Sequence, residues 1–499
     1  MSFASSGLTS PRTCCTGIHN SGRDPIPSLA NGGCARHLPL PGNGRDTAER
    51  EVNRFIFVAN GGPDVFQKSL NRRALLSVAL LVAGVPGALA KTAPEDGAGA
   101  YATGKYRNLF AEDGHSSRAI KARIDAAYQQ LFHGDPQTQA IAFAAGSNAD
   151  GPLMYVTDWA NHDVRTEGMS YGMMITVQLG KKAEFDALWN WAKTYMYISD
   201  PKAPSYEFFA WSCKTDGTHN SEGAAPDGES YFAMALLFAS NRWGDGKGIY
   251  DYHAEADKLL RAMVHRQVIS APGKYGPHAV GPMVNQDPPM ILFVPEIMQQ
   301  PFTDPSYHLP AFYELWARWG PAEDRAFWAR AAEVSRDFFV RTTHPKTGLA
   351  PSYANFDGTP HQTRFPQSGE FGYDAWRTAS NWSVDWSWWR KAPAEQQLSD
   401  RIQSFFASQG INDYGPVYTL DGKLLGTTPG LTHEAHPAGL AGTNAVAGLA
   451  ATDRARAKQF TDALWNTPIP SGQNRYYDGM LYLMSLMHLG GEFRIWGPQ

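Results

Sequence analysis

The chain has 499 residues, of which 43% are hydrophobic and 18% charged, and its formal net charge is -4. These values indicate a large globular protein and exclude the basic excess typical of proteins that bind nucleic acid. The 15 Trp, 21 Tyr and 25 Phe residues favour carbohydrate as a ligand because aromatic faces stack on sugar rings, although most of them would simply fill a large core.

The N-terminal part predicts an export signal in an unusual place. Residues 1–64 are rich in Gly, Pro, Ser and Arg and have no helical or strand period, so we interpret them as a spurious or disordered leader. Residues 65–90 combine basic residues, an apolar run too short to span a membrane, and a small-residue cleavage site. We expect translation to start near Val65 and the mature protein to start near Lys91. The protein would be exported to the periplasm or the medium, by the Sec or the twin-arginine route.

The cysteines and histidines predict neither a disulfide framework nor a metal site. Three of the four cysteines, Cys14, Cys15 and Cys34, precede the expected mature start, which leaves Cys213 without an internal partner. No Cys/His cluster has zinc-ligand spacing, so we expect no metal and no cofactor. We also expect a monomer with no membrane span in the mature form.

The mature part, 91–499, predicts twelve helices in a single domain. They are expected at 117–132, 167–179, 182–197, 229–242, 252–266, 307–319, 322–343, 375–389, 394–409, 437–450, 453–467 and 476–489. The odd-numbered helices are amphipathic, whereas the even-numbered ones are apolar nearly all round and rich in small residues, which is typical of buried helices. Six buried helices alternating with six half-exposed ones predict a double ring, an all-α (α/α)6 barrel with short β excursions in its loops.

Two segments interrupt this helical pattern. Residues 268–301 hold many Pro and Gly residues and the short apolar run 290–294, and residues 411–430 predict a hairpin that turns at Asp421-Gly422. Such excursions on a helical ring often form the walls of a cleft.

Carboxylates recur where the buried helices begin. Glu167, Asp227 and Asp374 each stand at such a start, and the inner ends of a double ring converge, so we expect the three to share one pocket. Each has a simpler explanation: Glu167 could neutralise the helix dipole, and Asp227 and Asp374 could be N-caps. Burial at a polar opening would instead raise the pKa of Glu167 into the range of a general acid. Cleavage of a glycosidic bond by inversion needs one such acid and one carboxylate base.

Four motifs in order along the chain together resemble family 8 of the glycoside hydrolases, and the resemblance covers roughly residues 100–490. The motifs are Glu167-Gly-Met-Ser-Tyr-Gly-Met-Met, Ala225-Pro-Asp-Gly-Glu-Ser-Tyr-Phe-Ala, Asp304-Pro-Ser-Tyr307 and Tyr373-Asp-Ala-Trp-Arg377. The resemblance implies an (α/α)6 barrel, inversion of anomeric configuration, Glu167 as general acid and Asp374 as general base. It also implies that Asp227 grips and distorts the central sugar, and that Tyr307 helps to hold the attacking water.

One further segment narrows the substrate. Ala435-His436-Pro437 resembles the His-Pro loop of the exo-oligoxylanases of this family, which release xylose from the reducing end of xylo-oligosaccharides. The resemblance implies that the loop blocks the cleft beyond the first leaving sugar. Ala435 replaces a larger apolar residue that is usual there, which weakens the block, and His436 could instead be a histidine that lines the barrel.

Other residues near the motifs are expected to bind substrate. Trp159, Trp211 and Trp376 are possible sugar platforms or core residues, and Arg165 and Arg377 could orient carboxylates or form structural ion pairs. Tyr373 and Tyr477 are further expected binding residues. Two alternatives to an exo-oligoxylanase remain open: an endo-acting β-1,4-xylanase or β-1,4-glucanase (cellulase, lichenase or chitosanase type) of the same family, and a non-catalytic helical sugar-binding protein.

Overall fold

The computed structural model describes residues 98–273, 276–425 and 438–498, all within one structural unit of the chain. The proposed leader, the export signal and the Ala435-His436-Pro437 segment lie outside these ranges, so the predictions about them stand untested. Within the described ranges no helix is both long enough and apolar enough to cross a bilayer.

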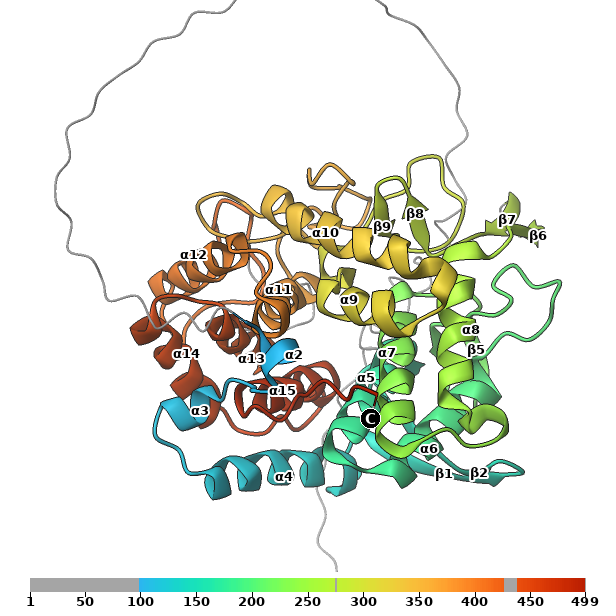
Figure 1. Cartoon of the computed structure of the whole chain (residues 1–499), viewed down its shortest axis with the longest axis horizontal. Coiled ribbons are helices and arrows are strands. Elements are labelled where there is room, and N and C mark those ends of the chain that lie inside the picture. Colours follow the sequence, from blue (N-terminus) through green and yellow to red (C-terminus); the bar gives the residue numbers. More distant parts are fainter. Residues whose placement is uncertain (1–97, 274–275, 426–437, 499) are drawn as a thin grey trace, which may run out of the picture. The chain divides into compact units, whose positions relative to one another are not determined.

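All twelve predicted helices are present, and they form an (α/α)6 barrel (Figure 1). The inner ring is made of α5 (Thr166–Leu179), α7 (Pro226–Trp243), α9 (Pro310–Trp319), α11 (Trp376–Trp389), α13 (Ala438–Val446) and α15 (Arg475–Leu489). The outer ring is made of α4 (Ser117–His133), α6 (Lys182–Trp191), α8 (Tyr252–His265), α10 (Arg325–Thr342), α12 (Ala394–Ser408) and α14 (Arg454–Asn466). Each inner helix contacts the next, and α15 contacts α5, which closes the ring.

Burial follows the predicted alternation. On α5 every residue from Gly168 to Gln178 is buried, whereas the outer helix α4 buries one face only. A helix surrounded on all sides needs small residues where its neighbours approach. A Cβ at Gly168 would come within 2.5 Å of the Tyr476 ring, and one at Gly228 would come within 2.5 Å of Thr166. These two glycines therefore let α15 and α7 approach α5 closely at the level of Glu167 and Asp227.

Several helix boundaries differ from the sequence prediction. Tyr307 belongs to the short 3₁₀ helix η3 (Pro305–Tyr307), and α9 begins only at Pro310, where proline suits the first turn. Asp374 lies in a second 3₁₀ helix, η5 (Tyr373–Ala375), directly before α11. The N-cap position of α11 is held by Ala375, and no side chain caps this helix end. Asp374 is therefore not the N-cap of α11.

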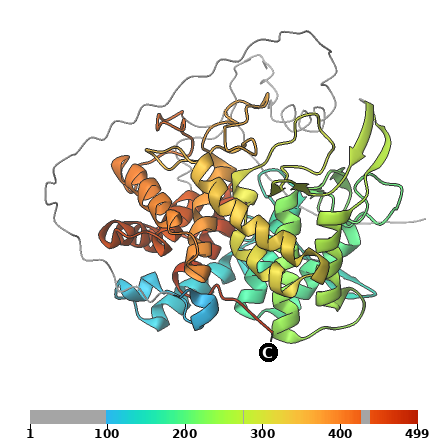
Figure 2. The same cartoon turned by 45° about the horizontal axis from the view of Figure 1, so that its top comes forward.

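Short β excursions lie in the loops, as predicted, although the sequence prediction did not place those that precede residue 268. β1 (Ala142–Asn148) and β2 (Gly151–Val156) form an antiparallel hairpin, and β3 (Val164–Arg165), β4 (Ser212–Cys213) and β5 (His219–Ser221) form a small sheet beside the start of α5. The Pro/Gly-rich segment carries two further hairpins, β6 (Ile269–Gly273) with β7 (Gly276–Val280) and β8 (Val284–Gln286) with β9 (Pro289–Ile291). In Figure 2 the β6–β7 hairpin and the connection between α10 and α11 lie on the same side of the helices.

Of the hairpin predicted at 411–430, the structure describes residues 411–425. Gly422 has a φ of 102° and its N–H bonds to the carbonyl of Thr419, which gives the predicted turn. Tyr418 bridges to Leu424 in the other arm, and it also bridges to Phe371, just before η5. This excursion therefore borders the segment that carries Asp374.

Candidate active site

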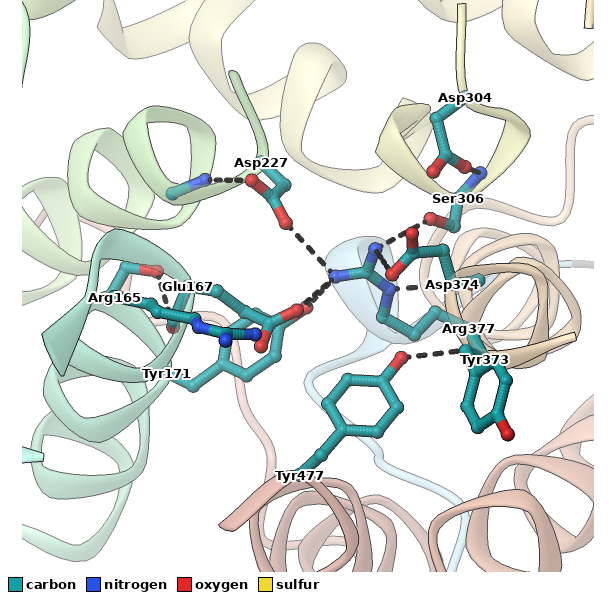
Figure 3. A network of polar contacts seen from close by, with 12 residues as sticks. Arg165, Glu167, Tyr171, Asp227, Asp304, Ser306, Tyr373, Asp374, Arg377 and Tyr477 are labelled. Carbon is teal, nitrogen blue, oxygen red and sulfur yellow. Dashed lines mark hydrogen bonds and ion pairs between the residues drawn. The ribbon is translucent and has the colours of Figure 1, made fainter. Parts of the chain in front are cut away.

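The three predicted carboxylates do meet, and they meet on one arginine (Figure 3). Nη1 of Arg377 lies 2.9 Å from Oε2 of Glu167 and 3.1 Å from Oδ2 of Asp227, and Nη2 lies 3.1 Å from Oδ1 of Asp374. The guanidinium also donates to the Tyr171 hydroxyl and to Oγ of Ser306. A planar guanidinium with five donors in a fixed fork can bind several carboxylates at once and hold each in a defined direction. These contacts agree with both roles predicted for Arg377, the orientation of carboxylates and a structural ion pair.

Glu167 has the environment of a general acid. Its Oε1 accepts a hydrogen bond of 2.9 Å from the Tyr476 hydroxyl, and its side chain is 16% exposed. Burial raises the pKa of Glu167 to about 7, against the opposing effect of Arg377 and with further help from Asp227 and Asp374. A carboxyl with such a pKa is largely protonated below neutral pH and can give its proton to a leaving group.

The other two carboxylates differ in their access to solvent. The Asp227 side chain is 9% exposed, its Oδ1 accepts the Gly228 N–H, and burial raises its pKa. The Asp374 side chain is 37% exposed, so it is the most accessible of the three. A general base that activates water needs such access to solvent.

Tyr307 and Tyr477 lie beside the same guanidinium. The centre of the Arg377 guanidinium is 5.7 Å from the Tyr307 ring centroid and 6.0 Å from that of Tyr477. Tyr477 donates its hydroxyl to the backbone carbonyl of Tyr373, whose φ of 37° is unusual for a residue with a side chain. This bond holds η5, and with it Asp374, against the inner helix α15.

The predicted tryptophans occupy different positions. Trp376 is 4% exposed and its indole N–H donates to the carbonyl of Pro416, which favours the packing role over the sugar platform. Trp159 and Trp211 are half-buried. The Trp211 ring lies 5.6 Å from the guanidinium of Arg165, and the Trp159 ring lies 4.1 Å from that of Arg475. Only these two keep the exposure that a sugar platform needs.

Arg165 forms ion pairs away from the Arg377 cluster. It pairs with Asp163 at 3.1 Å and lies 3.4 Å from Asp158, which agrees with the structural alternative. Its charge still lowers the pKa of the neighbouring Glu167. Among the described residues no group of three His, Cys, Asp or Glu side chains is placed to hold a metal ion.

Four residues in the cluster or beside it were not assigned a role from the sequence: Tyr171, Asp304, Ser306 and Tyr476. Tyr171 follows Glu167 by one helical turn and so shares its face, a spacing that could have identified it. Asp304 and Ser306 belong to the Asp304-Pro-Ser-Tyr307 motif. Tyr476 is separated from Glu167 by 309 positions, and no local pattern connects them.

Comparison with known proteins agrees with this geometry. Residues 148–491 match the family model for glycosyl hydrolases family 8. The chain is 47% identical over 403 residues to the reducing-end xylose-releasing exo-oligoxylanase Rex8A of Paenibacillus barcinonensis, covering 80% of this chain and 99% of the relative. It is 45% identical to a reducing end xylose-releasing exo-oligoxylanase of Halalkalibacterium halodurans, covering 80% of this chain and 97% of that one.

Solved structures give the same result. A family 8 xylobiose complex from Teredinibacter turnerae is 51% identical, with a TM-score of 0.77 over 80% of this chain and 100% of the other. Rex8A complexed with xylose is 45% identical, with a TM-score of 0.71 over the same shares. With three carboxylates gathered on Arg377 inside an (α/α)6 barrel, the chain belongs to family 8 of the glycoside hydrolases.

Proposed function

We propose that the protein is an inverting hydrolase that releases xylose from the reducing end of xylo-oligosaccharides. The observation that carries the chemistry is the Arg377 cluster, which combines a largely desolvated carboxyl, Glu167, with a more accessible carboxylate, Asp374. The preference for xylose is supported by the relatives, three of which are named for reducing-end xylose release.

In the proposed reaction Glu167 gives its proton to the glycosidic oxygen as the bond from that oxygen to C1 breaks. Asp374 accepts a proton from the water that attacks C1 from the opposite face, and the new hydroxyl has inverted configuration. Asp227, held by Arg377 and by the Gly228 N–H, would bind hydroxyls of the central sugar. Tyr307 would help to hold the attacking water. The protons then exchange with solvent, which restores a protonated Glu167 and an ionised Asp374.

The exo mode depends on the Ala435-His436-Pro437 segment. A segment that blocks the cleft after one leaving sugar would turn a groove for polymers into a pocket for chain ends. The alternative is an endo-acting enzyme, and it has support of its own. A structure from Teredinibacter turnerae that is 51% identical to this chain is described as a xylanase in complex with xylohexaose.

A blocked reducing end and a polymeric substrate distinguish the two modes, because xylotriose gives the same two products in either mode. Xylotriose should give xylose and xylobiose, and xylotriitol, in which the reducing end is an alditol, should be hydrolysed much more slowly. Polymeric xylan should lose viscosity slowly because each chain offers one reducing end. A rapid fall in viscosity, or equal rates on xylotriose and xylotriitol, would replace the exo assignment with the endo one. Preferential cleavage of cello-oligosaccharides would reject xylose as the preferred sugar.

We also propose that the mature protein is exported and acts as a monomer. Export is supported by the signal-like pattern at 65–90. Fractionation of cells that express the full chain, followed by N-terminal sequencing of the exported form, tests the expected start near Lys91.

A further inference from the structure

A fourth acidic residue, Asp304, lies beside the cluster and has no part in the reaction described so far. It is fully buried, at 0% exposure, and precedes η3. Its Oδ1 accepts the Ser306 N–H at 2.7 Å, whereas its Oδ2 is buried without a hydrogen-bond partner among the described residues. In Figure 3 its carboxyl group lies on the side of Ser306 and Asp374.

The charges around Asp304 do not compensate a further negative charge. Arg377, whose charge acts on Asp304, already binds Glu167, Asp227 and Asp374, and within the described ranges no cation forms an ion pair with Asp304. A buried carboxylate without a cation and with an unsatisfied oxygen is strongly unfavourable.

The other groups that face Asp304 are acidic or neutral. They are Asp374 from η5, Tyr307 from η3, Tyr353 from the connection between α10 and α11, and Tyr477 from α15. Burial first, and then the Asp374 carboxylate, raise the pKa of Asp304 well above its usual range, against the opposing effect of Arg377.

Asp304 is connected to Asp374 by a short chain of bonds. Oδ1 of Asp304 fixes the Ser306 backbone, Oγ of Ser306 accepts from Nη2 of Arg377 at 2.9 Å, and the same nitrogen binds Asp374. An ionised Asp304 would compete for this nitrogen and would repel the charge on Asp374. A neutral Asp304 still fixes the Ser306 backbone, and through it Arg377, but it neither competes for Nη2 nor repels Asp374.

We propose that Asp304 is a positioning residue that acts as a neutral carboxylic acid: it fixes the Ser306–Arg377 arrangement that holds Asp374 and leaves Asp374 the one ionised carboxylate on that side of the site. The proposal rests on the proposed role of Asp374 as the base. Its protonation state can be tested without any substrate.

The first test is infrared difference spectroscopy of the wild type against Asp304→Asn at neutral pH. We expect the wild type to show the carbonyl band of a protonated carboxyl that the variant lacks. If the only bands that the variant lacks are those of an ionised carboxylate, Asp304 is charged in the wild type and the proposal is wrong. Glu229→Gln is the matched control for the kinetic tests that follow, because Glu229 is also fully buried with one unpartnered oxygen but bonds to the Phe209 N–H and not to Arg377.

The kinetic test compares Asp304→Asn with Asp304→Leu on the best substrate of the wild type. Asparagine keeps an acceptor for the Ser306 N–H and a neutral donor, so kcat should stay within about threefold and both limbs of the pH profile should keep their positions. If Asp304 were ionised, removing its charge would lower the pKa of Glu167, and the alkaline limb would move to lower pH. Glu229→Gln should leave both limbs in place.

Leucine removes the hydrogen bond and should lower kcat by about 10- to 100-fold, with a smaller change in KM, because a misplaced catalytic group costs that much. In an Asp374→Asn background the same change should cost less than about threefold, because the group that Asp304 positions is already gone. An equal loss in both backgrounds would make Asp304 merely structural and overturn the proposal.

If Asp304→Leu does not fold, the pH profile of Asp304→Asn and the infrared band decide. A wild type without activity on xylo-oligosaccharides would reject the proposed function but not the infrared result.

Discussion

The hydroxyl of Tyr476 donates a hydrogen bond of 2.9 Å to Oε1 of Glu167, and so joins the last inner helix of the barrel to the first. The contact depends on Gly168, because a Cβ at that position would come within 2.5 Å of the Tyr476 ring. Closure of the ring therefore helps to set the protonation of Glu167.

Replacing Tyr476 by Phe should move the alkaline limb of the kcat/KM profile to higher pH. A donor to the carboxylate stabilises its charged form, so losing that donor raises the pKa of Glu167 from about 7, by up to about one unit. Glu167 must be protonated to act, so activity falls as pH rises through its pKa. The measurement is the pH dependence of xylotriose hydrolysis. Gly168→Ala should alter the same limb because it displaces the ring.

Tyr482→Phe is the matched control for this prediction. Tyr482 lies on the same helix but donates to the carbonyl of Thr467, so its removal should leave the profile unchanged. A Tyr476→Phe profile identical to that of the wild type would show that this hydrogen bond does not influence the acid.

Replacing Glu167 by Gln should abolish most activity on natural oligosaccharides, since leaving-group protonation contributes about 10²- to 10⁴-fold. A substrate with an activated leaving group needs less protonation, so its hydrolysis should be recovered in part. The ratio of kcat/KM values on the two substrates is the measurement. An equal loss on both would indicate a structural role for Glu167.

Replacing Asp374 by Asn should leave binding of xylo-oligosaccharides intact and lower kcat by about 10²- to 10⁴-fold, because the attacking water loses its base. Calorimetric binding and steady-state kinetics separate the two effects. Asp462→Asn makes the same charge change on the outer helix α14 and should have no effect.

Proton NMR of the wild-type reaction should show a first product of inverted anomeric configuration. A retained configuration would contradict the roles assigned to both carboxyls.

Replacing Ala435-His436-Pro437 by Gly-Gly-Gly should raise cleavage within xylan relative to release from the reducing end. The reason is steric, since a polymer cannot pass through a groove that is closed on its leaving side. Viscosity of xylan and chromatography of early products measure the two modes. If the replacement lowers both activities equally, the segment does not determine the exo mode.

Local patterns in the sequence were sufficient for the twelve helices and for their sorting into inner and outer rings. A helix that is buried on all sides has no polar face, and this absence can be seen in a few turns of sequence. In α5, the residues from Gly168 to Val177 are apolar or small except for Ser170 and Thr176. The carboxyls at the starts of α5 and α7 could be found in the same way. The short strands β1 and β2 were missed because their mixed burial gives no regular alternation.

Only the tertiary structure decided which groups share an environment. The bonds from Arg377 to Glu167 and to Asp227 join positions 210 and 150 residues apart, and they form because the inner helices converge at one end of a closed ring. The exposure of Asp374, the burial of Trp376 and the unpartnered oxygen of Asp304 likewise depend on packing between distant elements. Sequence supplies the type of each titratable group, whereas its pKa and its role follow from desolvation and from charges that only the folded chain brings near.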